Sequence, residues 1–416
     1  MMYYFNKLKS FLLRAARYGK FVTYQVGRRF LPASLKKLIL RLFHYGERKI
    51  IAQHQELLKQ ILQSVQPGKD YRSIIVFPPS LQWDVQLFQR PQQLALALAR
   101  QGALVFYLQS KPDRSKPPFQ LISDRIYLCN VHVDVFQILP SPLIYLLTWN
   151  SDYASRFRSP RILYDFVDDV NVFYGDHQKI VKGHDYLLHN AAIVLATARK
   201  LVDEARVLRP DVIYSPNGVV YSHFAYITQE SISPPADMLP VLAKSGPVIG
   251  YYGALARWFD YDLLKSVASL RPTYQFVLIG PDYDGTVEPA DIFKISNIHC
   301  LGVKPYIDLP AYLHFFDVAT IPFIVSDITH ATSPLKLFEY MAGGKPVVIT
   351  PMWESKQYEG VLVGGSPEEF AAQIDRALTL RHDPAYIEKI KRVAQQNTWE
   401  SRAEDILQRI HTLPAA

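Results

Sequence analysis

The feature that most constrains the fold is a repeated alternation between short apolar runs and segments with helical periodicity. It starts after Arg72, where residues 74–77 form an apolar run that ends at two prolines. A segment with helical spacing follows at 89–101, and a second apolar run lies at 103–108. Strand, helix and strand in this order predict two parallel strands joined by a crossover helix, with the sheet covered on both faces.

The alternation continues along most of the chain. Further strands are predicted at 143–147, 161–166, 192–196, 212–214, 248–252, 275–279, 318–321 and 346–349, and further helices near 178–190, 198–206, 260–269, 308–315, 334–342 and 367–380. The series is interrupted by a Pro-rich stretch at 229–246, which suits a linker around which two domains rotate. The pattern therefore predicts an α/β protein with two doubly wound, Rossmann-like domains and a cleft between the carboxyl ends of their strands.

The domain boundaries follow from this pattern. We expect a basic amphipathic helical extension at 1–70, a Rossmann-like domain at 71–228, the linker at 229–246, a second Rossmann-like domain at 247–396 and a C-terminal helix at 397–416. At 416 residues the chain is too long for one ordinary hydrophobic core. Two distant cysteines, Cys129 and Cys300, argue against a disulfide framework and suit a reducing compartment.

The positive charge of the chain is confined to its start. Residues 1–50 contain twelve Lys and Arg and one acid, Glu47, so this segment carries +11, whereas the whole chain carries +8 and the remainder −3. An enzyme that acts on nucleic acid needs its basic surface on the catalytic body, so we expect no nucleic-acid partner. No apolar run reaches the roughly 18 residues that a membrane span needs.

The basic segment predicts contact with an anionic membrane surface. An apolar stripe with helical spacing consists of Leu35, Leu38, Ile39, Leu42 and Phe43, and more apolar groups are Phe5, Phe11, Leu12, Leu13, Tyr18 and Phe21. Because Lys36, Lys37 and Arg41 fall off the stripe, we expect residues 1–66 to hold a cytoplasmic protein peripherally on the inner face of the cell membrane. Alternatively, the stripe packs on the next domain, which does not explain the excess of bases.

The most specific pattern is the stretch ATSPLKLFEYMAGGKPVV at 331–348. Ser333 suits the N-cap of a helix, and Pro334 and Leu335 its first positions. The free N–H groups of such a helix start, with Lys336 one turn inside, suit a diphosphate. Glu339 can accept hydrogen bonds from two vicinal ribose hydroxyls. A plain amphipathic helix with Lys336 and Glu339 on its wet face explains the same residues.

The first half offers its own candidates. Asp165, Asp168 and Asp169 come at the end of a predicted strand, where open α/β sheets place ligands. Asp168 or Asp169 is a candidate to orient or deprotonate an acceptor hydroxyl, although aspartates are also common in turns. Arg90 is a candidate to hold an acceptor phosphate, or it pairs with these aspartates.

Two residues follow the predicted strand at 248–252. Gly253 lets the backbone approach a donor phosphate, and Arg257 is a candidate phosphate ligand or a solvated loop residue. The Asp-x-Asp triplets at 260–262 and 282–284 are interpreted as a helix start and a loop, so no metal site is predicted.

Several stretches resemble, in order, the GT-B glycosyltransferases of the family 4 (group 1) type, in particular bacterial enzymes that build surface polysaccharide. They are FQRPQQLALALA at 88–99, LYDFVDDVNVF at 163–173, SPNGV at 215–219, IGYYGALARWFDYDLL at 249–264, FVLIGP at 276–281, LGVKPYIDLPAYLHFFDVATIPF at 301–323, SPLKLFEYMAGGKPVV at 333–348 and NTWESRAEDIL at 397–407.

The resemblance implies a glycosyltransferase in GT-B arrangement that moves a sugar from a nucleoside diphosphate sugar to a glycan or lipid-linked acceptor, with retention and without a metal or other cofactor. It implies that 71–228 is the acceptor domain and 247–396 the nucleotide-sugar-binding domain. It places the donor ribose on Glu339 and the diphosphate on Lys336 and the backbone of 333–335. Many members carry a second glutamate eight positions earlier, where this chain has Ala331. A non-catalytic sugar-nucleotide or glycan-binding relative and a sugar-nucleotide epimerase therefore stay open as alternatives.

Overall fold

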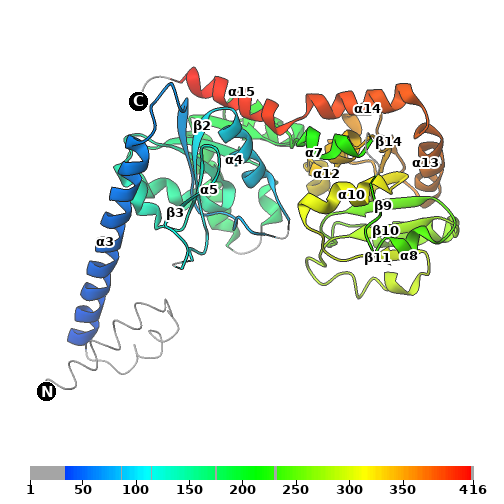
Figure 1. Cartoon of the computed structure of the whole chain (residues 1–416), viewed down its shortest axis with the longest axis horizontal. Helices are drawn as coiled ribbons and strands as arrows, with labels where there is room; N and C mark the ends of the chain where they lie inside the picture. The colour runs from blue at the N-terminus through cyan, green and yellow to red at the C-terminus, as the bar shows by residue number, and fades with distance from the viewer. Residues whose placement is uncertain (1–32, 86, 114, 174–175, 229–231, 414–416) are drawn as a thin grey trace. The chain divides into compact units, whose positions relative to one another are not determined.

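The computed structural model describes residues 33–85, 87–113, 115–173, 176–228 and 232–413. They fall into two compact units, one of residues 33–66 with Asp134–Ile138 and one of the described residues within 67–133 and 139–413. The smaller unit is built on the long helix α3 (Ala33–Gln63), blue in Figure 1. Inside this unit the side-chain amide of Gln55 donates to the carbonyl oxygen of Asp134 over 3.3 Å.

Helix α3 includes the stretch 35–43 that the sequence predicts as helical. The apolar residues predicted to reach the membrane further upstream, from Phe5 to Phe21, lie outside the described residues. Within the described ranges, no helix combines the length and the apolar character needed to cross a bilayer.

The first half of the larger unit contains an eight-stranded sheet in the order β3-β4-β2-β1-β5-β6-β7-β8. The strands are β1 (Ser73–Phe77), β2 (Ala103–Leu108), β3 (Phe119–Ser123), β4 (Ile126–Cys129), β5 (Leu143–Leu147), β6 (Arg161–Phe166), β7 (Ile193–Ala196) and β8 (Ile213–Tyr214). All neighbours are parallel except β3 and β4. The crossovers include α4 (Arg90–Arg100), α5 (His177–Asn190) and α6 (Arg199–Arg206).

The second half contains a six-stranded, fully parallel sheet in the order β11-β10-β9-β12-β13-β14. Its strands are β9 (Val248–Tyr252), β10 (Gln275–Ile279), β11 (Ile298–Cys300), β12 (Val318–Ile321), β13 (Val347–Ile349) and β14 (Leu362–Val363). Its helices are α7 (Tyr221–Ala225), α8 (Leu239–Leu242), α9 (Tyr261–Leu270), α10 (Leu309–His314), α11 (Asp327–His330), α12 (Leu335–Ala342), α13 (Pro367–Leu380) and α14 (Pro384–Gln396).

The predicted α/β class with two doubly wound sheets is confirmed. Each half has its own core, because the fully buried strands β2, β5, β9 and β10 bring apolar side chains to both faces of their sheets. The sequence pattern misses the edge strands β3, β11 and β14, which are short or half exposed and so lack a continuous apolar run.

The chain passes between the halves twice, and the two passages pair with each other. The amide of Val219 donates to the carbonyl of Asn397 over 3.0 Å, and the amide of Trp399 donates to the carbonyl of Val219 over 3.2 Å. A Cβ on Gly218 would lie 2.8 Å from the carbonyl carbon of Thr398, so only glycine allows this approach. After the second passage, α15 (Trp399–His411), red in Figure 1, packs on α4 of the first half.

The first of these passages, at Val219, precedes the stretch 229–246 that the sequence suggests as the linker. In the described part of that stretch, Met238 and Val241 are buried in the core of the second half. Pro240 lies in the first turn of α8, where the missing N–H is tolerated. Pro240 thus serves as an early residue of a helix on the second half, although proline by composition suggests a linker.

Candidate active site

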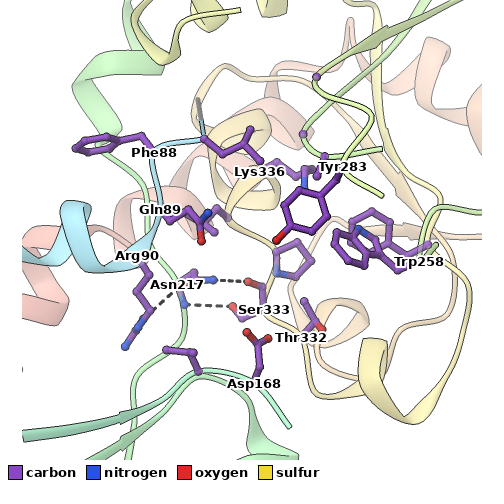
Figure 2. A pocket seen from close by; sticks show the side chains of 18 of the residues that line it. Phe88, Gln89, Arg90, Asp168, Asn217, Trp258, Tyr283, Thr332, Ser333 and Lys336 are labelled. Carbon is purple, nitrogen blue, oxygen red and sulfur yellow. Dashed lines mark hydrogen bonds between the residues drawn. The ribbon is translucent and has the colours of Figure 1, made fainter. Parts of the chain in front are cut away.

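A cavity of about 780 Å³ lies between the two halves of the larger unit (Figure 2). Asp168 follows β6, Gly253 follows β9 and Gly280 follows β10, so the cavity opens at the carboxyl ends of strands from both sheets. In Figure 2, Phe88, Gln89 and Arg90 occupy one side, and Trp258 and Tyr283 the other. Most of the predicted site residues line it: Arg90, Asp168, Gly253, Arg257, Ser333, Pro334, Leu335, Lys336 and Glu339.

The start of α12 differs by one residue from the prediction. The helix begins at Leu335, and Pro334, with φ −68° and ψ 123°, takes the N-cap position predicted for Ser333. Ser333 has another task, because its Oγ accepts a hydrogen bond from the amide of Asn217 over 3.2 Å. The side-chain amide of Asn217 donates to the carbonyl oxygen of Ser333. No side chain caps α12, and its first N–H groups face the cavity end of the helix.

The half-buried Lys336 and the buried Glu339 lie one helical turn apart at the second half's wall. Glu339 is 5% exposed, and burial raises the pKa of its carboxyl to about 7, against the opposing effects of the Tyr252 hydroxyl and Lys336. Burial also lowers the pKa of the Lys336 ammonium to about 8, which Glu339 opposes. Two oppositely charged groups with pKa values near neutrality favour a ligand that supplies both hydrogen-bond donors and negative charge.

Gly253 makes room for the Lys336 side chain. Its φ is +138°, and a Cβ there would lie 2.6 Å from Lys336 Cε. The ammonium also lies 5.3 Å from the ring centroid of Tyr251 and 5.1 Å from that of Phe323. Both aromatic faces stabilise a cation in this largely desolvated position.

Three aspartates of the two Asp-x-Asp triplets accept hydrogen bonds from nearby backbone amides. Asp260 accepts from the amide of Leu263 at the start of α9, and Asp282 accepts from the amide of Thr286. Asp284 accepts from the amide of Arg257 over 3.0 Å, which fixes the loop that brings Arg257 to the cavity.

On the first half's wall, Arg90 forms an ion pair with Asp165. The pair is bidentate, with N–O distances of 2.7 and 2.9 Å, and the two residues are 4% and 0% exposed. The remaining donors reach the Ser215 hydroxyl, the Pro216 carbonyl and the Asn217 side-chain oxygen. Since all five guanidinium N–H groups have protein acceptors, the structure favours the pairing alternative over a phosphate on Arg90.

The two other aspartates differ in position. Asp168 lines the cavity, and burial together with Asp165 and Asp169 raises its pKa to about 7, with Arg90 opposing. Asp169 is 8% exposed, accepts from the amide and the side chain of Asn171, and is absent from the cavity lining. The geometry therefore brings only Asp168 to a place where it can meet a substrate.

Sequence reasoning missed several residues of the site. Tyr252 lies against Glu339, Tyr306 lines the cavity, and Trp149 and Phe173 line it from the first half. In the sequence Tyr252 belongs to an apolar run and so resembles a core residue. It is the last residue of β9 and therefore lies at the carboxyl edge of the sheet. For the others, the sequence offers only isolated aromatic residues in loops.

Comparison with known proteins identifies the second half. Residues 246–379 match the family model described as glycosyl transferases group 1. The matched segment makes up most of the second half, which therefore resembles the domains of this glycosyltransferase family. A curated protein of Bacillus subtilis (strain 168), named "Putative teichuronic acid biosynthesis glycosyltransferase TuaH", is 28% identical over 197 residues, which are 46% of this chain and 48% of that protein. The match thus spans about half the length of this curated relative.

Solved structures extend the comparison to both halves. Sucrose-phosphate synthase from Thermosynechococcus elongatus has a TM-score of 0.60 at 18% identity, covering 82% of this chain and 98% of that one. HepE from Anabaena in complex with UDP-glucose has a TM-score of 0.60 at 15% identity, covering 82% and 100%. At this identity the likeness shows the fold, and it confirms the predicted GT-B arrangement.

Hydrogen bonds to Glu354 of the second half connect it to the first half. Its carboxylate is fully buried and accepts from the backbone amide of Arg199 over 2.8 Å and from the Arg199 guanidinium over 3.1 Å. It also accepts from the Tyr214 hydroxyl, which in turn bonds the Tyr358 hydroxyl at 2.9 Å. Because Arg199 opens α6, a carboxylate of one half caps a helix of the other.

Replacing Glu354 by alanine should therefore lower stability. The change leaves buried donors of Arg199 and Tyr214 without their acceptor, which costs about 1–3 kcal/mol. Urea unfolding followed by tryptophan fluorescence measures the loss as a lower midpoint. The control is Glu359→Ala, whose carboxylate pairs with Lys389 at the surface and should change the midpoint little. Equal midpoints for both variants would contradict the assigned tie.

Proposed function

We propose that this protein is a glycosyltransferase that uses a nucleoside diphosphate sugar as donor. The single observation that carries the proposal is the half-buried Lys336 together with the buried Glu339 at the open start of α12, facing a cavity between two Rossmann-like halves. A diphosphate would take Lys336 and the free N–H groups of the helix start, while the ribose hydroxyls would donate to Glu339. That HepE has been solved with UDP and with UDP-glucose supports a nucleotide sugar in such a fold.

The donor phosphates would lie next to Gly253. Lacking a side chain, this glycine leaves the space beside Lys336 open, and Arg257 brings a second positive charge to the same side. With two cations and a helix start on this side of the cavity, we propose that transfer needs no metal ion or other cofactor. Activity that is lost in EDTA and restored by a divalent cation would contradict this part.

We propose transfer with retention of anomeric configuration, as the resemblance to family 4 implies. The bond between the anomeric carbon and the leaving phosphate breaks, the acceptor oxygen forms the new bond on the same face, and its proton passes to the departing phosphate. An inverting enzyme would need a protein base, for which Asp168 is the residue that the cavity offers. NMR of the product's anomeric configuration separates the two courses.

The acceptor is proposed to be a glycan or a lipid-linked sugar in bacterial cell-envelope polysaccharide synthesis, with hexosyl transfer as the reaction. The name of the Bacillus subtilis relative supports this setting. Ala331 favours a non-catalytic sugar-nucleotide-binding protein as the second candidate, since it stands where many relatives have a glutamate. Donor binding without hydrolysis or transfer would support that second candidate.

Changing Glu339 to glutamine should weaken donor binding. Glutamine keeps one acceptor oxygen but replaces the other by an amide donor, so one hydrogen bond to a charged acceptor is lost. This loss costs about 1.5–3 kcal/mol, which corresponds to roughly 10- to 150-fold in Kd. Calorimetry with whichever UDP-, GDP- or ADP-sugar stabilises the protein most gives the affinity. Glu359→Gln is the matched surface control. Wild-type affinity in Glu339→Gln would remove this residue from the donor site.

Donor affinity should also pass through a maximum near pH 7–8. Below pH 7 the Glu339 carboxyl, whose pKa is raised to about 7, becomes protonated and stops accepting from the ribose. Above pH 8 the Lys336 ammonium, whose pKa is lowered to about 8, loses the charge that holds the diphosphate. Titrations between pH 5.5 and 9.5 test this, and the acid limb should flatten in Glu339→Gln.

We also propose that residues 1–66 attach the protein peripherally to the cytoplasmic face of the cell membrane. Twelve bases against one acid in residues 1–50 support this, because each base near an anionic surface contributes about 1 kcal/mol. Cosedimentation with vesicles containing phosphatidylglycerol should show binding at low salt that falls as salt rises. The truncated protein lacking 1–66 is the comparison. Full-length protein that ignores these vesicles at low salt would rule the attachment out.

A further inference from the structure

The cavity wall contributed by the first half is apolar. Half-buried side chains of Leu87, Trp149, Val167, Val172 and Phe173 line it, and we call these five residues the acceptor wall. The Trp149 and Phe173 rings lie 5.2 Å apart between centroids and are tilted by 50°, so they form one angled aromatic surface. The donor-binding groups Lys336 and Glu339 belong to the other half, which leaves this wall to the acceptor.

The acceptor wall offers no cation to a substrate within the described part of the lining. Arg90 is the only base that this half brings to the cavity, and its five donors are all bound to protein acceptors. Asp168 is the only acid there, and it lies beside Asp165 and Asp169. Lys304, across the cavity, pairs with Asp237 at 2.7 Å. A phosphate or carboxylate on the acceptor would meet negative charge without a counter-ion.

No residue of the described chain donates a hydrogen bond to the Asp168 carboxylate, and Figure 2 shows this side chain pointing into the pocket. A carboxylate in such a place is suited to accept from a hydroxyl. A sugar ring presents hydroxyls around its rim and C–H groups on its face, and aromatic side chains bury such a face well. The wall thus combines the two kinds of contact that a neutral sugar needs.

From this juxtaposition we propose that the reacting unit of the acceptor is an uncharged sugar, held with its C–H face on Trp149 and Phe173 and a hydroxyl directed at Asp168. The inference rests on the proposed glycosyltransferase function and names the class of acceptor. A sugar phosphate is excluded as the unit that docks on this wall, although a charged group further along a longer acceptor is compatible with it.

The first test compares neutral acceptors with charged ones on the wild-type protein. With the donor found by thermal stabilisation, release of nucleoside diphosphate is measured with octyl glucoside, octyl galactoside and octyl N-acetylglucosaminide, and with glucose 6-phosphate and glucuronic acid. At least one neutral glycoside should react about tenfold faster, by kcat/KM, than either charged sugar. A charged sugar as the best acceptor would overturn the proposal.

The second test uses variants of the wall. Trp149→Ala and Phe173→Ala should each raise KM for the best neutral acceptor about tenfold and leave the donor Kd unchanged, whereas Trp149→Phe should recover part of the loss. Trp353→Ala is the control, because Trp353 is 36% exposed and does not line the cavity. An unchanged acceptor KM in both alanine variants would contradict the assignment.

A binding measurement separates failure of this inference from failure of the proposed function. Saturation-transfer NMR with the same sugars, on protein saturated with the nucleoside diphosphate, reports contact without turnover. Contacts to neutral glycosides that disappear in Trp149→Ala support the acceptor wall even if no transfer occurs. Absence of nucleotide-sugar binding counts against the proposed function, and contacts only to charged sugars count against the wall.

Discussion

The ion pair between Arg90 and Asp165 is the interaction on which the rest of this structure depends. Burying two charges is expensive, and it is tolerated here because every donor of the guanidinium and both carboxylate oxygens have partners. Through Asn217 the same network reaches Ser333 in the loop before α12. One buried cation thus fixes the end of β6, the passage between the halves and the approach to the donor-facing helix.

This network explains how the two walls of the cavity acquire different chemistry. On the first half, all donors of Arg90 bind protein acceptors, so the described cavity wall there is an apolar surface with one carboxyl, Asp168. On the second half, Lys336 has aromatic neighbours and one acid, Glu339, so its charge stays available to a ligand. A base beside an acid therefore stabilises the packing in the first half, whereas in the second half it is placed to bind a ligand.

How much of this structure the sequence predicts depends on how far apart in the chain the interacting residues lie. Buried strands such as β2, β5 and β6 are predicted residue by residue, because an uninterrupted apolar run is a local pattern. Lys336 and Glu339 are found because they share one helix start. The hydrogen bond between Ser333 and Asn217 and the role of Glu354 are not predictable in this way, since each depends on a partner more than a hundred positions away.

The pairing of Val219 with Asn397 and Trp399 has a consequence for how the chain folds during synthesis. The first core is completed by Trp399, Ile406 and Leu407 of α15, so this half is discontinuous in sequence. Its sheet emerges from the ribosome early. The face of α4 that α15 covers nevertheless stays exposed to solvent until the whole second half has been synthesised. The half whose strands are synthesised first is thus finished last, and in the interval the apolar surface that α15 later covers is open to aggregation.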